Sequence, residues 1–157
     1  ALNLGDRVAV VAAADDMAAR LHAVDPTARI DGYLVQEMVS GTEVILGVRE
    51  DPQFGAFMVV GLGGVLVEAM RDISFRMLPV NEADGREMLD ELRGKAVLGA
   101  FRGSPARDVD ALVKAIRSLS DLYMDYRLHL ADLEVNPLIV GATGEGVRAV
   151  DVRPVWR

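Results

Sequence analysis

The sequence predicts an α+β fold in which helices cover one side of a mainly antiparallel sheet. Three apolar runs rich in β-branched residues, at 32–39, 42–49 and 54–62, are separated only by short turn sequences, which favours an antiparallel meander. Residues 109–123 instead repeat apolar side chains with the period of an amphipathic helix. Strands and helices that do not alternate regularly are typical of the α+β class.

Before the meander, the sequence predicts a short strand at 2–4 and a helix at 7–24. Asp6 precedes this helix and can cap it, because its carboxylate can accept hydrogen bonds from the free N–H groups of the first turn. Asp25-Pro26 then ends the helix, since proline disfavours helical geometry in the residue before it.

After the meander, we expect a fourth strand at 73–78, a helix at 82–92 and a short helical segment at 94–99. Ser104-Pro105 is interpreted as the start of the clearest helix, because proline is favoured in a first helical turn. One apolar stripe defines that helix, made of Val109, Leu112, Val113, Ile116, Leu119, Leu122 and Tyr123.

A predicted β-hairpin, 132–138 with 147–151, carries three oxygen-bearing side chains: Glu134, Asn136 and Asp151. Glu134 and Asn136 share one face, because strand side chains alternate. Mg²⁺ prefers oxygen ligands and is commonly held by one or two protein groups together with nucleotide phosphates. Asp151 stands among apolar residues, where an unpaired buried charge would be costly, so we expect a cation beside it.

The hairpin also has a plainer interpretation. Acids near turns are usually solvated, and Asn136-Pro137 is an ordinary turn signal. Pro137 cannot donate a hydrogen bond to a neighbouring strand, so it indicates a strand edge or a bulge.

Three further segments are candidate binding sites. The amides of Gly61-Leu62-Gly63-Gly64 can form an anion nest, although a tight turn explains these glycines equally well. Glu43 lies inside an apolar strand, where an acid favours a functional site. Gln36-Glu37-Met38-Val39 ends a predicted strand and can present polar groups to the edge of a purine, although most such segments merely end a strand.

Arg71 and Arg76 can either contact phosphate or pair with neighbouring acids, and the sequence does not separate these alternatives. Arg102 and the helix start at Ser104-Pro105 can either lie beside an anion or form a plain loop before a capped helix. His22 and His129 have no metal-binding or nucleophilic companion at a recognisable spacing. We interpret both histidines as structural.

Composition excludes several classes of function. The net charge of −7 disfavours nucleic acid as a partner, because nonspecific binding needs a basic surface. No apolar run is long enough for a membrane span. The absence of cysteine excludes disulfides, thiolate nucleophiles and zinc clusters of cysteine, and we expect a cytoplasmic protein.

Read together, these stretches resemble the ATP-grasp domain of the NDP-forming acyl-CoA synthetases, which include ADP-forming acetyl-CoA synthetase and, more distantly, the succinyl-CoA synthetase β subunit. The order and spacing of four pieces over nearly the whole chain carry the resemblance. These pieces are 35–39 with 43–48, 51–55 leading to 61–65, 98–103, and 133–138 with 149–151.

The resemblance implies a site for ATP or ADP and Mg²⁺. The adenine pocket would be formed by Gln36, Glu37 and Val39, further nucleotide contacts by Glu43, Gly63 and Gly64, and the metal site by Asn136 and Asp151. Glu134 would be the catalytic acid that faces a phosphorylated histidine from a partner domain. The face that Glu134 shares with Asn136 agrees with this expectation.

The resemblance also implies a reaction and partners. The domain would transfer a phosphoryl group between ATP or ADP and the phosphohistidine of an ADP-forming acid–CoA ligase of the acetate–CoA ligase type. Catalysis would depend on positioning and on neutralised phosphate charge. The CoA-binding and ligase domains, in the same chain or a partner subunit, would supply the histidine and bind CoA and a small carboxylic acid. We expect an oligomer.

The chain departs from the family pattern at its start. In the family, a phosphate-contacting lysine lies in the first lobe, before the segment that matches 2–4. We therefore expect a partial domain, with 1–39 as the end of the first lobe and 40–157 as the second, that is inactive alone. The alternatives are a regulatory ATP-grasp-like module fused to a protein acetyltransferase, with little or no catalysis, and an inert fragment with solvated acids.

Overall fold

A computed structural model describes residues 1–63, 72–101 and 103–157 of the chain. It divides into two units, 1–39 and 40–157, which are described separately below. No helix in the described part of the chain combines the length and the apolar character needed to cross a membrane.

The first unit contains the helix α1 (Arg7–Val24), which has the predicted ends. Asp6 caps it, accepting a hydrogen bond of 2.8 Å from the backbone N–H of Ala9. At the other end, the N–H of Asp25 donates to the carbonyl of Leu21 at 2.8 Å.

The predicted strands at 2–4 and 32–39 are wrong, because both segments have irregular backbone. A strand needs a neighbour for its N–H and C=O groups, and residues 1–39 contain no strand that could serve as one. None of these residues is buried, and Val8 and Val24 on α1 are largely exposed. The apolar, β-branched composition of 32–39 is therefore not enough to form a strand, because the segment has no strand to pair with.

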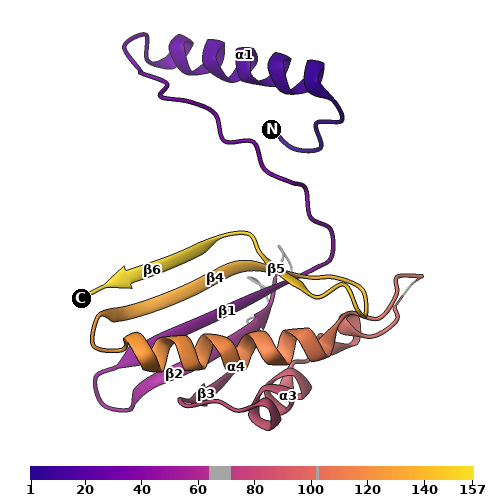
Figure 1. The fold of residues 1–157 in the computed structure, drawn as a ribbon, viewed down its shortest axis with the longest axis vertical. Helices are drawn as coiled ribbons and strands as arrows, with labels where there is room; N and C mark the ends of the chain where they lie inside the picture. The colour runs from indigo at the N-terminus through magenta and orange to yellow at the C-terminus, as the bar shows by residue number, and fades with distance from the viewer. Residues whose placement is uncertain (64–71, 102) are drawn as a thin grey trace. The chain divides into compact units, whose positions relative to one another are not determined.

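The second unit is built on an antiparallel sheet of six described strands, with β3-β2-β1-β4-β5 in order and β6 paired with β4 (Figure 1). The predicted antiparallel pairing of 42–49 with 54–62 is confirmed as β1 and β2, but the third strand of the meander is β3, which was predicted as a separate fourth strand, and not 32–39. The strands are β1 (Thr42–Asp51), β2 (Gly55–Leu62), β3 (Ile73–Met77), β4 (Leu130–Val140), β5 (Val147–Ala149) and β6 (Val152–Trp156).

Helices α3 (Glu82–Glu91) and α4 (Val109–Tyr126) lie against one face of this sheet, joined by the 3₁₀ turn η1 (Lys95–Leu98) (Figure 1). The core forms between these helices and the alternate strand residues that face them. Its completely buried members include Val44, Val60, Met88, Leu112 and Ile116. The opposite face of the sheet, called the open face below, is not packed against α3 or α4.

Two details of α4 differ from the prediction. Ser104 does not start the helix, and its main chain exchanges hydrogen bonds with that of Phe101. Helix α4 begins after Asp108, whose carboxylate accepts from the N–H of Ala111 at 3.1 Å. The same carboxylate accepts from the N–H groups of Gly144 and Gly146 in the turn between β4 and β5. This long-range anchor could not be read from the local Ser-Pro signal. Leu122 is 45% exposed and does not belong to the buried stripe.

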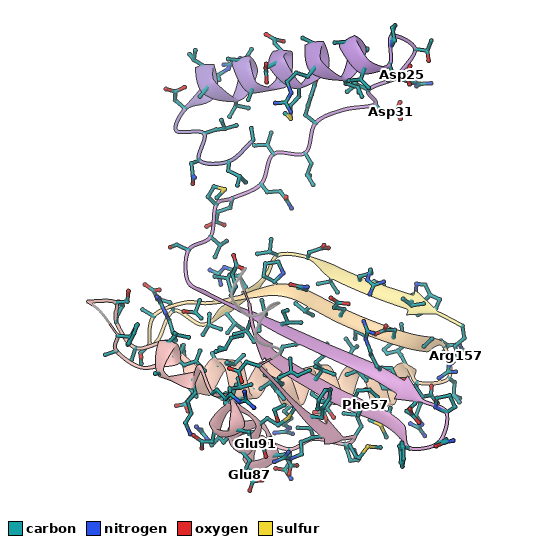
Figure 2. The ribbon with its side chains drawn as sticks, turned by 180° about the vertical axis from the view of Figure 1, so that it is seen from behind. Asp25, Asp31, Phe57, Glu87, Glu91 and Arg157 are labelled. Atoms are coloured by element: carbon teal, nitrogen blue, oxygen red, sulfur yellow. The ribbon has the colours of Figure 1, made fainter. Side chains whose placement is uncertain are left out.

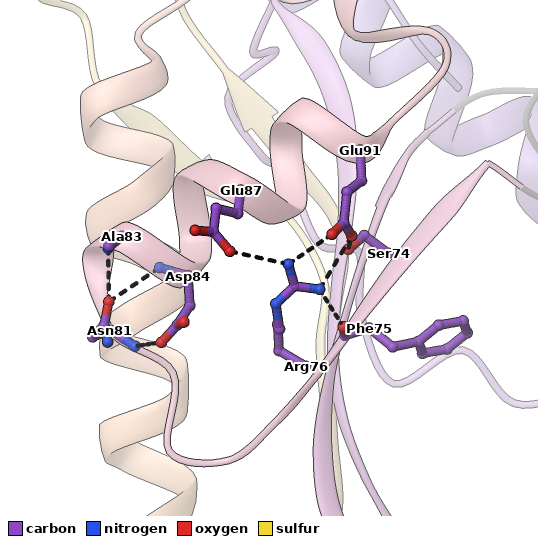
Figure 3. Close-up of polar contacts among 8 residues, drawn as sticks. All are labelled: Ser74, Phe75, Arg76, Asn81, Ala83, Asp84, Glu87 and Glu91. Carbon is purple, nitrogen blue, oxygen red and sulfur yellow. Dashed lines mark hydrogen bonds and ion pairs between the residues drawn. The ribbon is translucent and has the colours of Figure 1, made fainter.

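The polar residues of β3 face α3 (Figure 3). Arg76 pairs with Glu91 at 2.6 Å and Glu87 at 3.3 Å, and the Ser74 hydroxyl donates to Glu91 at 2.5 Å. Of the two alternatives for Arg76, the structure therefore shows pairing with acids. Asn81 caps α3, because its side chain accepts from the first-turn N–H groups at 2.8 and 3.0 Å.

We predict that Ile116→Ala lowers the free energy of unfolding by about 2–5 kcal/mol, because it removes buried methyl groups and leaves a cavity. Leu122→Ala, in the same helix, serves as the control and should cost under about 1 kcal/mol, since that side chain is half exposed. Urea unfolding of both variants checks this. Equal losses would show that α4 does not face the core as described.

We predict that Asp108→Asn weakens the fold at neutral pH but not in strong acid. The pKa of Asp108 is lowered mainly by the hydrogen bond from the N–H of Ala111, and next by that from the N–H of Gly146. A lowered folded-state pKa gives stability that is present above the unfolded pKa and is lost as the pH falls through the folded one. Thermal unfolding of the wild type and variant should therefore converge towards acid pH, whereas the exposed control Asp125→Asn should show no such convergence.

Candidate functional site

The open face of β4 carries the predicted catalytic acid. Leu133 and Val135 are buried in the core, so Glu134 between them projects from the open face, as alternation predicts. The side chain of Glu134 is 22% exposed. The Nδ2 of Asn136 donates to its Oε1 at 3.2 Å, which confirms that Glu134 and Asn136 share a face.

A β-bulge displaces Asn136-Pro137 from the regular sheet. Val44 pairs with Leu138 and Leu46 pairs with Val135, so Ile45 alone lies opposite both Asn136 and Pro137. The predicted bulge at Pro137 is thus confirmed. Because of the extra residue, Val135 and Leu138 both point into the core, and Asn136 is exposed.

Asp151 lies beside Asn136 through main-chain hydrogen bonds. The N–H of Asn136 donates to the carbonyl of Asp151, and the N–H of Val150 donates to the carbonyl of Pro137, both at 3.0 Å. These bonds hold the segment between β5 and β6 against the bulge. The structure therefore brings the main chains of the two predicted metal ligands together.

Asp151 does not have the buried surroundings from which we predicted a cation beside it, so that prediction is wrong in its premise. Asp151 is exposed, and its neighbours Val150 and Val152 are 46% and 50% exposed. The chain leaves β5 and enters β6 at this point, so these apolar residues do not enclose the carboxylate. The case for a metal here now rests on the proximity and the chemistry of the donors.

Two arginines surround Glu134 on the open face. Arg153 of β6 donates to it at 2.8 Å, and Arg49 of β1 lies 3.7 Å from it. The hydrogen bond from Arg153, followed by that from Asn136, lowers the pKa of Glu134, so it is ionised at neutral pH. Sequence reasoning missed both arginines; the only signal was their strand parity, which places them on the same face as Glu134.

Within residues 1–63, 72–101 and 103–157, no three His, Cys, Asp or Glu side chains converge as a metal site. The available donors are an amide, Asn136, and a carboxylate, Asp151. Two protein ligands suffice for an ion that completes its shell with phosphate and water. This donor set therefore suits Mg²⁺ bound together with a nucleotide and does not suit a metal held by protein alone.

Glu43 and Gly63 lie side by side at the ends of β1 and β2. The N–H of Gly63 donates to the carbonyl of Glu43 at 2.6 Å, and a Cβ on Gly63 would lie 2.5 Å from the Cβ of Glu43. Glycine is thus required at 63 by close packing, and its N–H is not free to bind an anion. The Glu43 side chain is exposed and not enclosed by the strand. Gly64, Arg71 and Arg102 lie outside the described residues.

The predicted purine-binding segment belongs to the first unit. Its Gln36 lines a cavity of about 210 Å³ together with Met17 of α1, Tyr33 and Met38. Glu37 and Val39 do not line this cavity. The lining is mixed, because the amide side chains of Asn3 and Gln36 and the phenol of Tyr33 lie among apolar residues.

Comparison with known proteins places this geometry in a family. A family model described as an ATP-grasp domain matches residues 1–155. The chain is 40% identical over 133 residues to subunit beta of acetate–CoA ligase (ADP-forming) II from Pyrococcus furiosus, which covers 84% of this chain and 56% of that subunit. It is 35% identical over 127 residues to the 4-hydroxybutyrate–CoA ligase (ADP-forming) of Nitrosopumilus maritimus, covering 80% of this chain and 18% of that protein.

Solved structures share the fold. The dinucleotide-forming acetyl-coenzyme A synthetase 1 of Ca. Korarchaeum cryptofilum, with coenzyme A, acetyl-coenzyme A and a phosphorylated phosphohistidine segment, has a TM-score of 0.85 and 34% identity over 100% of this chain and 69% of that one. Its complex with coenzyme A and Mg-AMPPCP has a TM-score of 0.71 and 35% identity, covering 76% and 55% of the two chains.

The chain thus spans about half the length of the Pyrococcus subunit and under a fifth of the Nitrosopumilus protein. The predicted α+β fold, an antiparallel sheet with helices on one face, is confirmed by these neighbours. From the family match over residues 1–155 and the shared fold, we conclude that this chain belongs to the ATP-grasp family, as a domain similar to those of ADP-forming acetyl-CoA synthetases.

Proposed function

We propose that this chain is the nucleotide- and magnesium-binding region of an ADP-forming acid–CoA ligase and transfers a phosphoryl group between ATP or ADP and a phosphohistidine. The observation that carries the proposal is the bulge in β4, which holds Asn136 against Asp151 beside the ionised Glu134. Support comes from the relatives, which include ADP-forming acetate–CoA ligases and a synthetase described with Mg-AMPPCP and a phosphohistidine segment that points towards its nucleotide site.

The orientation of Asn136 suits the metal. A carboxylate can only accept hydrogen bonds, so the amide NH₂ faces Glu134 and the Oδ1 faces away, free to coordinate a cation. Within the described residues, the carboxylate of Asp151 makes no hydrogen bond, although Arg153 attracts it through space. Mg²⁺ held by these two oxygens would neutralise phosphate charge during transfer.

Glu134 has a different role in this proposal. Arg153 and Arg49 hold its carboxylate ionised on the open face. An ionised carboxylate accepts a hydrogen bond from an imidazole N–H and thereby fixes the tautomer and orientation of the ring. Glu134 would thus position the incoming histidine and stabilise its positive charge, while the amide of Asn136 separates this acid from the metal.

The remaining assignments complete the nucleotide site. The unit 1–39 would be the end of the first lobe and 40–157 the second. Gln36, with Glu37 and Val39, would contact the adenine, whereas Glu43 and Gly63 would shape the wall of the site. Domains that carry the histidine, in the same chain or a partner subunit, would bind coenzyme A and the small carboxylic acid in an oligomeric enzyme. The lengths of the relatives and their beta-subunit names support this division.

We predict that Asn136→Ala and Asp151→Ala in the full-length protein each raise the Mg²⁺ concentration needed for half-maximal histidine phosphorylation by about 10- to 100-fold, because each removes one protein oxygen from the metal. The measurement is acid-labile phosphate formed from labelled ATP across a Mg²⁺ titration. The control is Asp125→Ala on the exposed side of α4, which should leave the titration unchanged.

Glu134→Gln in the same assay distinguishes a residue that contacts the histidine from one that binds the metal. It should lower the rate of phosphorylation at saturating Mg²⁺ while the midpoint of the titration stays within about twofold of wild type. If the variants at Asn136 and Asp151 kept a wild-type midpoint, the metal assignment would be wrong. A shifted midpoint in Glu134→Gln would make Glu134 a metal ligand and not a histidine contact.

A further inference from the structure

Arg153 lies on the open face beside Glu134. The two residues are register partners in β6 and β4, and the Nη2 of Arg153 donates to the Oε2 of Glu134 at 2.8 Å. The side chain of Arg153 is 59% exposed, and within the described residues it makes no other hydrogen bond. Because a guanidinium has five N–H donors, most of those on Arg153 remain available to a ligand on this face.

Arg153 also lies close to the proposed metal ligands. Asp151 precedes it by two residues in the chain, and the N–H of Asn136 donates to the carbonyl of Asp151 at 3.0 Å. The charges of Glu134 and Asp151 both attract the guanidinium. The same cation is therefore bonded to the acid assigned to the histidine and attracted by a residue assigned to Mg²⁺.

Arg49 occupies a different position on the open face. The strands β1, β4 and β6 lie side by side in the sheet (Figure 2), so Arg49 and Arg153 approach Glu134 from opposite sides. Arg49 is the register partner of Asp132, which is farther along β4 from Asn136 than Glu134 is. It lies 3.7 Å from the carboxylates of Asp132 and Glu134. By register, Arg153 is nearer than Arg49 to the proposed metal ligands.

The proposed reaction would bring negative charge to this part of the face. A ring nitrogen of the histidine would form a bond to the γ-phosphorus of ATP, while the bond from that phosphorus to the bridging oxygen breaks and ADP leaves with the electron pair. The other ring nitrogen would keep its proton and donate a hydrogen bond to Glu134. During transfer, charge is spread over the three equatorial oxygens of the phosphoryl group. The ionised Glu134 would repel these oxygens, so a cation beside them is needed.

We propose that Arg153 is a catalytic residue whose free N–H groups contact the phosphoryl group as it passes between the histidine and the nucleotide, while its bond to Glu134 holds the guanidinium in place. This role rests on the proposed function, because it needs a phosphoryl group to contact. A planar guanidinium can donate to two phosphate oxygens at once, and its charge offsets theirs. Arg49, in contrast, acts on the reaction only through Glu134.

The test measures histidine phosphorylation by labelled ATP at saturating Mg²⁺ in the full-length protein, in the wild-type and the Glu134→Gln backgrounds. Arg153→Ala should lower the rate about 100-fold or more in both backgrounds, because it removes donors to the transferring group. Arg153→Lys keeps the charge but loses the planar pair of donors, so its rate should lie between those of wild type and Arg153→Ala.

Two other arginines serve as controls. Arg49→Ala should lower the rate in the wild-type background but cause no further loss in Glu134→Gln, because it acts through that acid. Arg117→Ala, on α4, removes an arginine of similar exposure that pairs with Glu82 at 3.3 Å. It should leave the rate unchanged in both backgrounds.

One result would overturn the proposal: in the Glu134→Gln background, Arg153→Ala leaves the rate within about twofold of Glu134→Gln alone. Arg153 would then act only through Glu134. The Mg²⁺ titrations of Asn136→Ala and Asp151→Ala would still be shifted in that case. Unshifted midpoints in those titrations would instead contradict the proposed function itself.

Discussion

Between the pairs Val44–Leu138 and Leu46–Val135, β4 contains one residue more than β1, and the candidate site depends on this bulge. The extra residue lets Val135 and Leu138 both enter the core, which closes the sheet against α4. It also leaves main-chain groups of Asn136 and Pro137 free to pair with the segment between β5 and β6. The packing that stabilises the fold thus also joins Asn136 and Asp151 through a main-chain hydrogen bond.

Charge on the open face is arranged around the same strand. Arg153 and Arg49 approach Glu134 from β6 and β1, on either side of β4. The hydrogen bond from Arg153, then that from Asn136, and more weakly the charge of Arg49 lower the pKa of Glu134. Asn136 donates to the same acid and so directs its own oxygen away from it. In the proposed function, Glu134 would serve the histidine, whereas the Oδ1 of Asn136 and the carboxylate of Asp151 would serve Mg²⁺. Phosphoryl transfer needs both kinds of site close together.

Local sequence patterns predicted the structure correctly wherever it depends on local contacts. Alternation placed Glu134 and Asn136 on one face, and Asp6 and Asp25 marked the ends of α1. Predictions failed where a distant segment decides the outcome. Residues 32–39 have no strand to pair with, α4 starts where Asp108 reaches the β4–β5 turn, and Asp151 is exposed because the chain changes strands there. The arginines around Glu134 are also brought together only by strand pairing.

The most direct test of the central claim locates the metal itself. Crystals of the full-length protein, grown with a non-hydrolysable ATP analogue and Mn²⁺ in place of Mg²⁺, would show the ion by its anomalous scattering. We expect an ion within about 2.0–2.3 Å of both the Oδ1 of Asn136 and the carboxylate of Asp151, with phosphate oxygens completing its shell. An ion bound to the nucleotide while these two side chains remain unliganded would contradict the claim.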